Sequence, residues 1–359
     1  MGCQRVLFVF YVPIIKSKRG EFTAVRLLQE DIKEQIRPFV DVLPPNRFAP
    51  KPKTLAEQLT WVADHVAAAW SGPLWVDTFD VGPPVVQGKQ VAIEFVCRAL
   101  RAKTLVPIPV TGFEREHGHD HGVTRLLSEA ATGVCLRLEE EDLLLPAKLP
   151  TLLDSKMKLL GVAPPSIDLL FDLRYLGAEP AAARVQMLER AIQHIQDLDT
   201  WRSIVLAGSS MPNSLEGVCA RGAHGYLARR ELEIWLALQN SAVKRLPTFG
   251  DYTTVPPQYA EMDTRTIAKH LGPNVKYTLD KRWYVSRGQS FRKNGSAQYF
   301  SIARNIVSLP DFRGSAASDG DRFIAQRASG GTTCGNPEQW VIASVNSHIT
   351  WQTRWLTLT

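Results

Sequence analysis

The chain has 359 residues, of which 45% are hydrophobic and 22% are charged. This balance excludes an intrinsically disordered chain and provides enough apolar side chains for a large core. The 42 Lys and Arg residues against 36 Asp and Glu residues give a net charge of +6, a mild excess that permits an anionic partner without specifying one.

Five cysteines are spread along the chain without a CxxC pair: Cys3, Cys97, Cys135, Cys219 and Cys334. Their odd number and wide spacing argue against a disulfide framework and against a thiolate zinc site. We therefore expect a protein of the reducing cytoplasm. The apolar run over residues 6–15 is too short to span a bilayer and lacks a small-residue cleavage site, so we expect no membrane association.

Short apolar runs bounded by turn residues predict eight β-strands, over residues 11–15, 37–43, 73–79, 104–110, 133–138, 166–173, 203–208 and 246–252. Helical spacing predicts helices over residues 23–35, 55–69, 91–102, 123–131, 180–195, 228–238 and 264–270. Residues 142–160 are ambiguous because Pro146 and Pro150 interrupt their pattern. Eight alternating units favour a closed (β/α)8 TIM-like barrel over an open doubly wound sheet. No GxGxxG motif follows a strand, which argues against dinucleotide binding.

The pattern changes after Leu271. Residues 275–280 and 282–288 favour β-structure, and residues 297–306 predict a helix. We therefore predict a barrel-like domain over residues 1–272 and a C-terminal α+β extension over residues 273–359, which is either an appended subdomain or a cap packed on the barrel.

Charged and polar residues follow the predicted strands. Loops that follow the strands of a (β/α)8 barrel gather at one face, so these residues predict a charged barrel mouth. They are Lys16, Lys18, Glu21, Asp77, Asp80, Asp172, Arg174, Ser209, Ser210, Asp251 and Tyr252. Basic side chains beside carboxylates can bind phosphate, and paired carboxylates can divide acid and base roles. The alternative is that these groups pair with one another or are solvated.

The run SIDLLFDLR places Asp168, Leu170, Asp172 and Arg174 on one face of a strand. We expect this face to point into the barrel, where a buried aspartate needs a partner. The pattern predicts either a structural Asp and Arg network across the lumen or a catalytic or binding pair of Asp172 and Arg174 at the mouth.

The stretch EREHGHDHG places His117, His119, Asp120 and His121 close together after the fourth strand. Imidazoles at this density can hold zinc or a similar divalent metal. The stretch is similar to the HxHxDH of metallo-β-lactamase-type hydrolases, but the residue between the second His and the Asp is absent. The alternative is a flexible surface loop without a metal.

In RWYVSRGQSFR, aromatic residues alternate with basic ones in a manner that suits bases and phosphates. We predict Arg287, Gln289 and Arg292 as ligand-binding residues there. A β-hairpin that packs its aromatic rings on the barrel is the alternative.

The opening YVPIIKSKRGEFTAV, residues 11–25, followed by IRPFVDVLP, residues 36–44, resembles the start of the phage- and prophage-associated Beta protein family, whose members open with Y-x-P-I-L-K-x-K-x-G-E. R-G-x-S-F-R at residues 287–292 and G-N-x-x-x-W with S-V-N-x-H-I at residues 335–349 extend the resemblance over nearly the whole chain. Two departures would degrade a family site: SAASDGD, residues 315–321, stands where an aromatic residue with a Gly-Asp pair is expected, and Ser347 with His348 stands where paired histidines are expected. His348 is therefore a further candidate for ligand binding.

The resemblance implies a role in conflict between bacteria and phages, beside a partner such as a defence or toxin effector encoded nearby. We predict a component of an anti-phage defence system that binds a phosphate-bearing ligand, nucleic acid or the effector at the mouth, with Lys16, Lys18, Arg174, Asp251 and Tyr252 as ligand-binding residues. The alternative is a hydrolase of phosphodiester or nucleotide substrates. There, Lys16 and Arg174 hold anionic oxygens, while Glu21, Asp77 or Asp172 acts as base or metal ligand.

Overall fold

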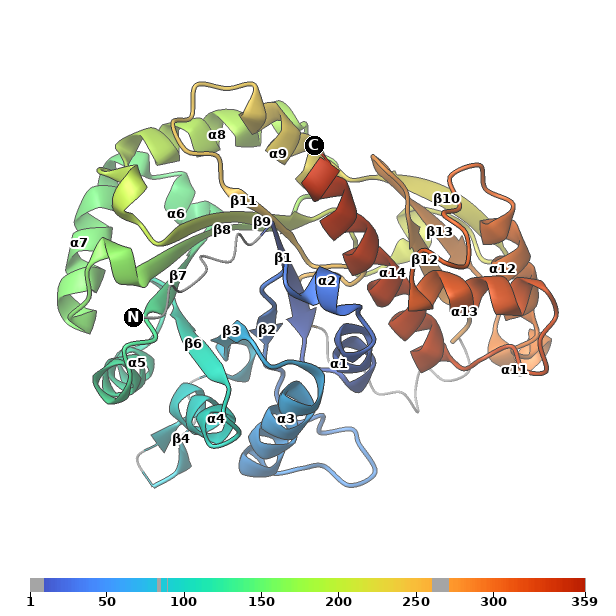
Figure 1. Cartoon of the computed structure of the whole chain (residues 1–359), viewed down its shortest axis with the longest axis horizontal. Helices are drawn as coiled ribbons and strands as arrows, with labels where there is room; N and C mark the ends of the chain where they lie inside the picture. The colour runs from blue at the N-terminus through green and yellow to red at the C-terminus, as the bar shows by residue number, and fades with distance from the viewer. Residues whose placement is uncertain (1–9, 83–84, 89, 260–270, 359) are drawn as a thin grey trace.

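Eight parallel strands form a closed barrel in the computed structural model of the chain, which describes residues 10–82, 85–88, 90–259 and 271–358. Their order around the barrel is β1-β11-β9-β8-β7-β6-β3-β2 (Figure 1). They are β1 (Tyr11–Lys16), β2 (Phe39–Asp41), β3 (Pro73–Asp77), β6 (Val106–Thr111), β7 (Val134–Glu139), β8 (Ile167–Tyr175), β9 (Ser203–Ser209) and β11 (Thr248–Asp251). Each overlaps one of the eight predicted runs, so the predicted (β/α)8 barrel is confirmed.

Helices follow most of the strands and cover the outside of the barrel (Figure 1). They are α1 (Arg19–Arg26), α2 (Glu30–Lys33), α3 (Leu55–Ala69), α4 (Ala92–Arg101), α5 (His117–Glu129), α6 (Glu140–Leu143), α7 (Leu149–Leu160), α8 (Ala181–His194) and α9 (Arg230–Gln239). The predicted helix over residues 23–35 is two helices, and the ambiguous segment contains α6 and α7. The predicted helix over residues 264–270 lies outside the described residues.

Side chains alternate between the lumen and the surrounding helices. Leu170 of β8 belongs to the apolar cluster that fills the lumen, whereas Leu169 and Phe171 belong to the cluster between strands and helices. The lumen cluster takes residues from all eight strands or from the positions that follow them, and it includes Trp75 and Tyr252. The predicted period of two in β8 is thus confirmed.

Beside the barrel lies a three-stranded antiparallel sheet in the order β10-β13-β12. It combines β12 (Asn274–Thr278) and β13 (Arg282–Arg287) with β10 (Ala223–Ala228), which comes from the chain before residue 272. The helices α11 (Phe291–Asn294), α12 (Gln298–Val307) and α13 (Asp319–Ala328) belong to the same part (Figure 1). The sheet thus contains one strand from before and two strands from after the predicted domain boundary at residue 272. The division into two domains stays a prediction.

The helix α14 (Pro337–Leu358) lies between the barrel and this sheet (Figure 1). It packs against α1 and β1 on one side and against β12 and α13 on the other. Its Val345, Ile349 and Leu356 belong to the same apolar cluster as the outer side chains of the barrel strands. The end of the chain therefore covers the barrel beside its first strand. In the described part of the chain, no helix has both the length and the apolar character needed to cross a bilayer.

Candidate functional site

Arg137 of β7 is the centre of the barrel mouth. Its side chain is fully buried, and its guanidinium donates hydrogen bonds to three carboxylates and one phenol. The distances are 3.0 Å to Asp41, 2.6 Å to Asp77, 2.8 and 2.5 Å to Asp172, and 2.6 Å to the Tyr252 hydroxyl, which itself donates to Asp172 at 2.5 Å. The ends of four strands are thereby tied to one cation.

A second layer of ion pairs surrounds this centre. The ammonium group of Lys16 donates to Asp41 at 2.7 Å and to Asp80 at 3.1 Å. Arg115, after β6, donates to Asp77 at 2.9 Å. Each of these cations has a carboxylate within hydrogen-bond distance, so the predicted binding residue Lys16 is already engaged.

Arg174 completes the mouth from the end of β8. Its backbone has a φ of 51°, in the left-handed region that non-glycine residues seldom adopt, and it lies within the register shift between Asp172 and Tyr175. The guanidinium donates to Glu139 at 3.0 and 2.5 Å and lies 4.9 Å from the centre of the Phe79 ring. Arg115 lies 4.6 Å from the same ring. We call the ion-paired set of Lys16, Asp41, Asp77, Asp80, Arg115, Arg137, Glu139, Asp172, Arg174 and Tyr252 the mouth network.

Two carboxylates of the mouth network, those of Asp77 and Asp41, have a lowered pKa. Burial by itself raises the pKa of Asp77, but the ion pairs with Arg115 and Arg137 outweigh it and hold this pKa below its usual range. The pKa of Asp41 is lowered in the same way: burial opposes the shift, and Lys16 and Arg137 outweigh it. This geometry is the Asp and Arg network across the lumen. Asp77 and Asp172 each form an ion pair with Arg137 in this network. A catalytic role for either aspartate stays a prediction.

Glu21 lies in the first turn of α1 and is fully buried. One carboxylate oxygen accepts a hydrogen bond from the backbone N–H of Lys16 at 2.8 Å, while Oε1 has no partner in the described structure. Burial raises the pKa of Glu21 to about 7, against the opposing effect of Lys18. Lys276 of β12 lies near both, and burial, with a smaller contribution from Lys18, lowers its pKa to about 8. Lys276 was not predicted from the sequence.

Asp251 lies on the outer side of the barrel and not in its mouth. Its carboxylate accepts a hydrogen bond from the Tyr11 hydroxyl at 2.5 Å, contacts Nε2 of His348 at 3.0 Å and lies 3.5 Å from the guanidinium of Arg229. Its neighbour Tyr252 points into the lumen, because successive residues of a strand face opposite sides. The expected placement of Asp251 in the mouth is therefore wrong.

His348 joins α14 to the barrel. Its Nδ1 lies 2.8 Å from the hydroxyl of Thr278, and its ring stacks on Trp283 with 4.9 Å between the centroids. Asp251, His348 and Thr278 thus form an acid, imidazole and hydroxyl series, but all three are buried. The arrangement fits a structural clamp, because no substrate can reach a hydroxyl that is closed off from solvent.

The three histidines predicted as metal ligands do not converge. They lie at the start of helix α5 and not in a loop, with His117 and His121 exposed. His119 bonds the carbonyl of Val110 at 2.9 Å, and Asp120 is paired with Lys156 at 2.8 Å. Residues two apart on a helix point to nearly opposite sides. Within the described ranges, no group of three or more His, Cys, Asp or Glu residues could hold a metal ion.

The other predicted binding residues lie in or beside β13. Arg287 is buried and donates to the carbonyl of Cys219 at 2.8 Å. Gln289 donates to the carbonyl of Arg221 at 3.2 Å, while Arg292 is exposed. Of these three, Arg287 lines a pocket.

Two pockets open on the face where the barrel strands end. The first pocket, 340 Å³ in volume, lies in the loops after β1 and β2, and its lining includes Lys18, Arg19, Asn46, Lys53, Gln58 and Trp61. The second pocket, 420 Å³ in volume, lies between the loops after β9 and β11 and the strands β12 and β13. Its lining includes Ser214, Glu216, Arg221, Asn274, Lys276 and Arg287. Basic side chains therefore gather outside the mouth network on the same face.

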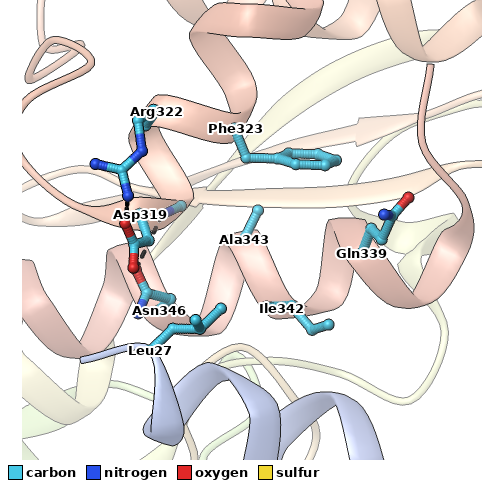
Figure 2. A pocket seen from close by; sticks show the side chains of 9 residues that line it. Leu27, Asp319, Arg322, Phe323, Gln339, Ile342, Ala343 and Asn346 are labelled. Carbon is cyan, nitrogen blue, oxygen red and sulfur yellow. Dashed lines mark hydrogen bonds and ion pairs between the residues drawn. The ribbon is translucent and has the colours of Figure 1, made fainter. Parts of the chain in front are cut away.

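An apolar groove of 320 Å³ lies elsewhere, between the end of α1, α13 and α14. Figure 2 shows Leu27, Phe323 and Ile342 around it, with the Asp319 and Arg322 ion pair at one side. The two segments that depart from the family pattern, residues 315–321 and residues 347–348, contact each other beside this groove. The Ser347 hydroxyl donates a hydrogen bond to Asp321 at 3.1 Å.

Comparisons with known proteins address the family and the fold. The family model described as Beta protein matches residues 11–354. No match is found among curated proteins. Among solved structures, triosephosphate isomerase from Bartonella henselae is similar, with 11% identity, a TM-score of 0.36, and coverage of 68% of this chain and 92% of the other. Because the family match spans nearly the whole chain, this protein belongs to the Beta protein family.

Proposed function

We propose that this chain is the ligand-binding component of a phage- or prophage-encoded anti-phage defence system of the cytoplasm, and that it binds a phosphate-bearing ligand in the first pocket. One observation carries the proposal: Lys18, Arg19 and Lys53 line this pocket, and no carboxylate is among the described residues that do so. The guanidinium of Arg19 is already bonded to the carboxylate of Glu338 at 2.6 and 2.5 Å. The ammonium groups of Lys18 and Lys53 have no ion pair with the described residues, and such groups suit an anion.

The remaining lining of the first pocket suits a nucleotide-like ligand. Asn46 and Gln58 offer amide groups. Trp61 offers an aromatic ring that already packs against His65, with 4.0 Å between the ring centroids, so a base would contact the part of the ring that His65 leaves uncovered. The ammonium group of Lys53 lies 4.3 Å from the centre of that ring. A phosphate placed beside Lys18 and Lys53 would leave the ring within reach of the attached base.

The hydrolase alternative has weaker support. Asp77 and Asp172 accept hydrogen bonds from Arg137 at 2.6 and 2.5 Å, so both carboxylates are already engaged within the network. Glu21 has a pKa near neutrality, which suits a general base, but its side chain is fully buried. Hydrolysis by this site would need the mouth network to open.

Isothermal titration calorimetry with pyrophosphate tests the binding proposal. The double variant Lys18→Glu with Lys53→Glu should bind at least about tenfold more weakly, because two attractive charges become repulsive. The matched control is Lys158→Glu with Lys244→Glu, because both lysines are exposed and lie before strands, at the opposite end of the barrel. The control should bind like the unchanged protein. Equal weakening in both variants, or no binding by the unchanged protein, would refute the proposal.

The defence role needs a test in cells. The chain should reduce phage plating when it is expressed with its neighbouring genes, and native mass spectrometry of that sample should show a complex with an effector. The double variant should lose protection while it keeps its fold. Protection that survives in the double variant but is lost in Glu21→Gln would favour the hydrolase alternative.

A further inference from the structure

The second pocket is lined by basic side chains from two parts of the chain. Lys276 and Arg287 come from neighbouring strands of the sheet, and Arg221 comes from the loop after β9. Asn274 and Ser214 add groups that can form hydrogen bonds. The carboxylate of Glu216, which is exposed, is 3.6 Å from Arg287. Among the described residues that line the pocket, the three basic side chains therefore outnumber the one acidic side chain.

Lys276 is the notable member of this pocket. The residue is partly buried, and its ammonium group has neither an ion pair nor a hydrogen bond with any residue that the structure describes. The desolvation of an ammonium group is costly unless an anion or a hydrogen-bond acceptor compensates for it. Glu21 is near enough to act on Lys276, but it lies beyond ion-pair distance and has a raised pKa of its own. A ligand anion would supply the missing partner.

The two pockets adjoin each other. Lys18 lines the first pocket and Lys276 lines the second, and each is close enough to act electrostatically on the other. The loop after β11 supplies Tyr259 to the first pocket and Pro256 to the second. A strip of positive charge thus continues from Lys53 through Lys18 and Lys276 to Arg287.

We propose that the second pocket is a phosphate subsite and that the two pockets together bind one strand of nucleic acid, with Lys18 and Lys276 on successive parts of its backbone. This inference rests on the proposed function and specifies the class of ligand. The first pocket provides an aromatic ring for a base, and both pockets provide cations for the backbone, the combination typical of single-strand binding. Each pocket has the volume of a small-ligand site, and together they suit a flexible chain that bends from one to the other.

Fluorescence anisotropy with labelled oligothymidylates of two to twelve nucleotides tests this inference. The affinity should rise with length until both pockets are filled and should then level off. Lys276→Gln should weaken the binding of the twelve-nucleotide strand by about tenfold and should lower the slope of log K against log salt by about 0.7. Lys276→Arg, which keeps the charge, should restore most of the affinity. Lys244→Gln is the matched control and should change neither quantity.

Pyrophosphate binding separates the two proposals. Most of its affinity should remain in Lys276→Gln, because the first pocket, which the proposed function assigns to pyrophosphate, is intact in this variant. If pyrophosphate binds but the long strand binds no more tightly than the dinucleotide, or if Lys276→Gln binds the long strand normally, the second subsite is refuted and the proposed function survives. If neither probe binds, both are refuted. A loss of effector binding in Lys276→Gln without any oligonucleotide binding would identify this face as a protein interface and would also refute the inference.

Discussion

The mouth network and the two pockets beside it are charged regions of the same barrel face, and they differ in how their charges are compensated. In the mouth, Arg137, Lys16 and Arg174 each have a carboxylate within 3.0 Å. In the pockets, Lys18 and Lys276 have none among the described residues. The most strongly charged part of the face is therefore satisfied internally, and the more sparsely charged part is where a ligand can gain attraction.

The difference follows from burial. A buried ion must be paired, because the loss of hydration costs several kcal/mol for each ion. The strand ends point inward, so their charges form a closed network, whereas the side chains of the following loops keep contact with water. A high density of charged residues at strand ends thus indicates a network that supports the barrel, and the loop cations are better candidates for ligand contact.

Removal of Arg137 should have the largest effect. Arg137→Ala leaves Asp41, Asp77 and Asp172 buried without their common cation, and we expect a loss of about 3–5 kcal/mol in the free energy of unfolding, measured by urea denaturation. Arg137→Lys should recover part of this loss. Arg292→Ala, which removes an exposed guanidinium, should change stability by no more than about 0.5 kcal/mol. A loss below about 1 kcal/mol in Arg137→Ala would mean that the network does not stabilise the barrel.

Arg137 also illustrates how much of the barrel and its mouth network can be predicted from the sequence. The eight strands were predictable because buried parallel strands form short apolar runs. The inward face of β8 was predictable from the alternation of Asp168, Leu170 and Asp172. The same alternation is present in GVCLRL, where Arg137 stands between two leucines. An arginine on the inner face of a barrel strand, with aspartates after other strands, would have predicted the network.

Other features depend on contacts that no local pattern shows. The helix α14 was not predicted, because its side chains are buried against α1 and β1 at the opposite end of the sequence and against β12 and α13 nearer to it. The partner of His348 is Asp251, 97 residues away. The position of Lys276 beside Lys18 likewise depends on how β12 docks on the barrel. The glycines between the histidines favour a loop at residues 117–122, whereas in the structure these residues form the first turns of α5.

Truncation of His348 should have an intermediate effect, because it breaks the clamp between α14 and the barrel. His348→Ala removes the ring stacked on Trp283 and leaves Asp251 and Thr278 without their common partner. We expect a loss of about 2–3 kcal/mol in the free energy of unfolding, measured by urea denaturation. His194→Ala, at an exposed histidine bonded only to a carbonyl of its own helix, is the control and should be nearly neutral. Equal stability of the two variants would show that the clamp contributes little.

The smallest effect should come from Glu21, and it depends on pH. The pKa of Glu21 in the folded chain is raised from 4.5 to about 7, mainly by burial. Between these two values the folded state binds the proton more tightly than the unfolded state, so stability is greatest below pH 4.5 and falls as the pH rises through 7.

Glu21→Gln removes this titration, so the variant should gain stability relative to the unchanged protein between pH 5 and pH 8, measured as the difference in the free energy of unfolding at each pH. Glu57→Gln is the control with the opposite expectation. The backbone and side chain of Thr54 lower the pKa of Glu57, so its carboxylate favours the folded state above pH 4.5, and its replacement should reduce stability there. A Glu21→Gln curve parallel to that of the unchanged protein would show that this carboxylate finds a compensating cation in solution. Lys18 and Lys276 would then be paired with it, and the contrast between the closed mouth and the open pockets would no longer hold.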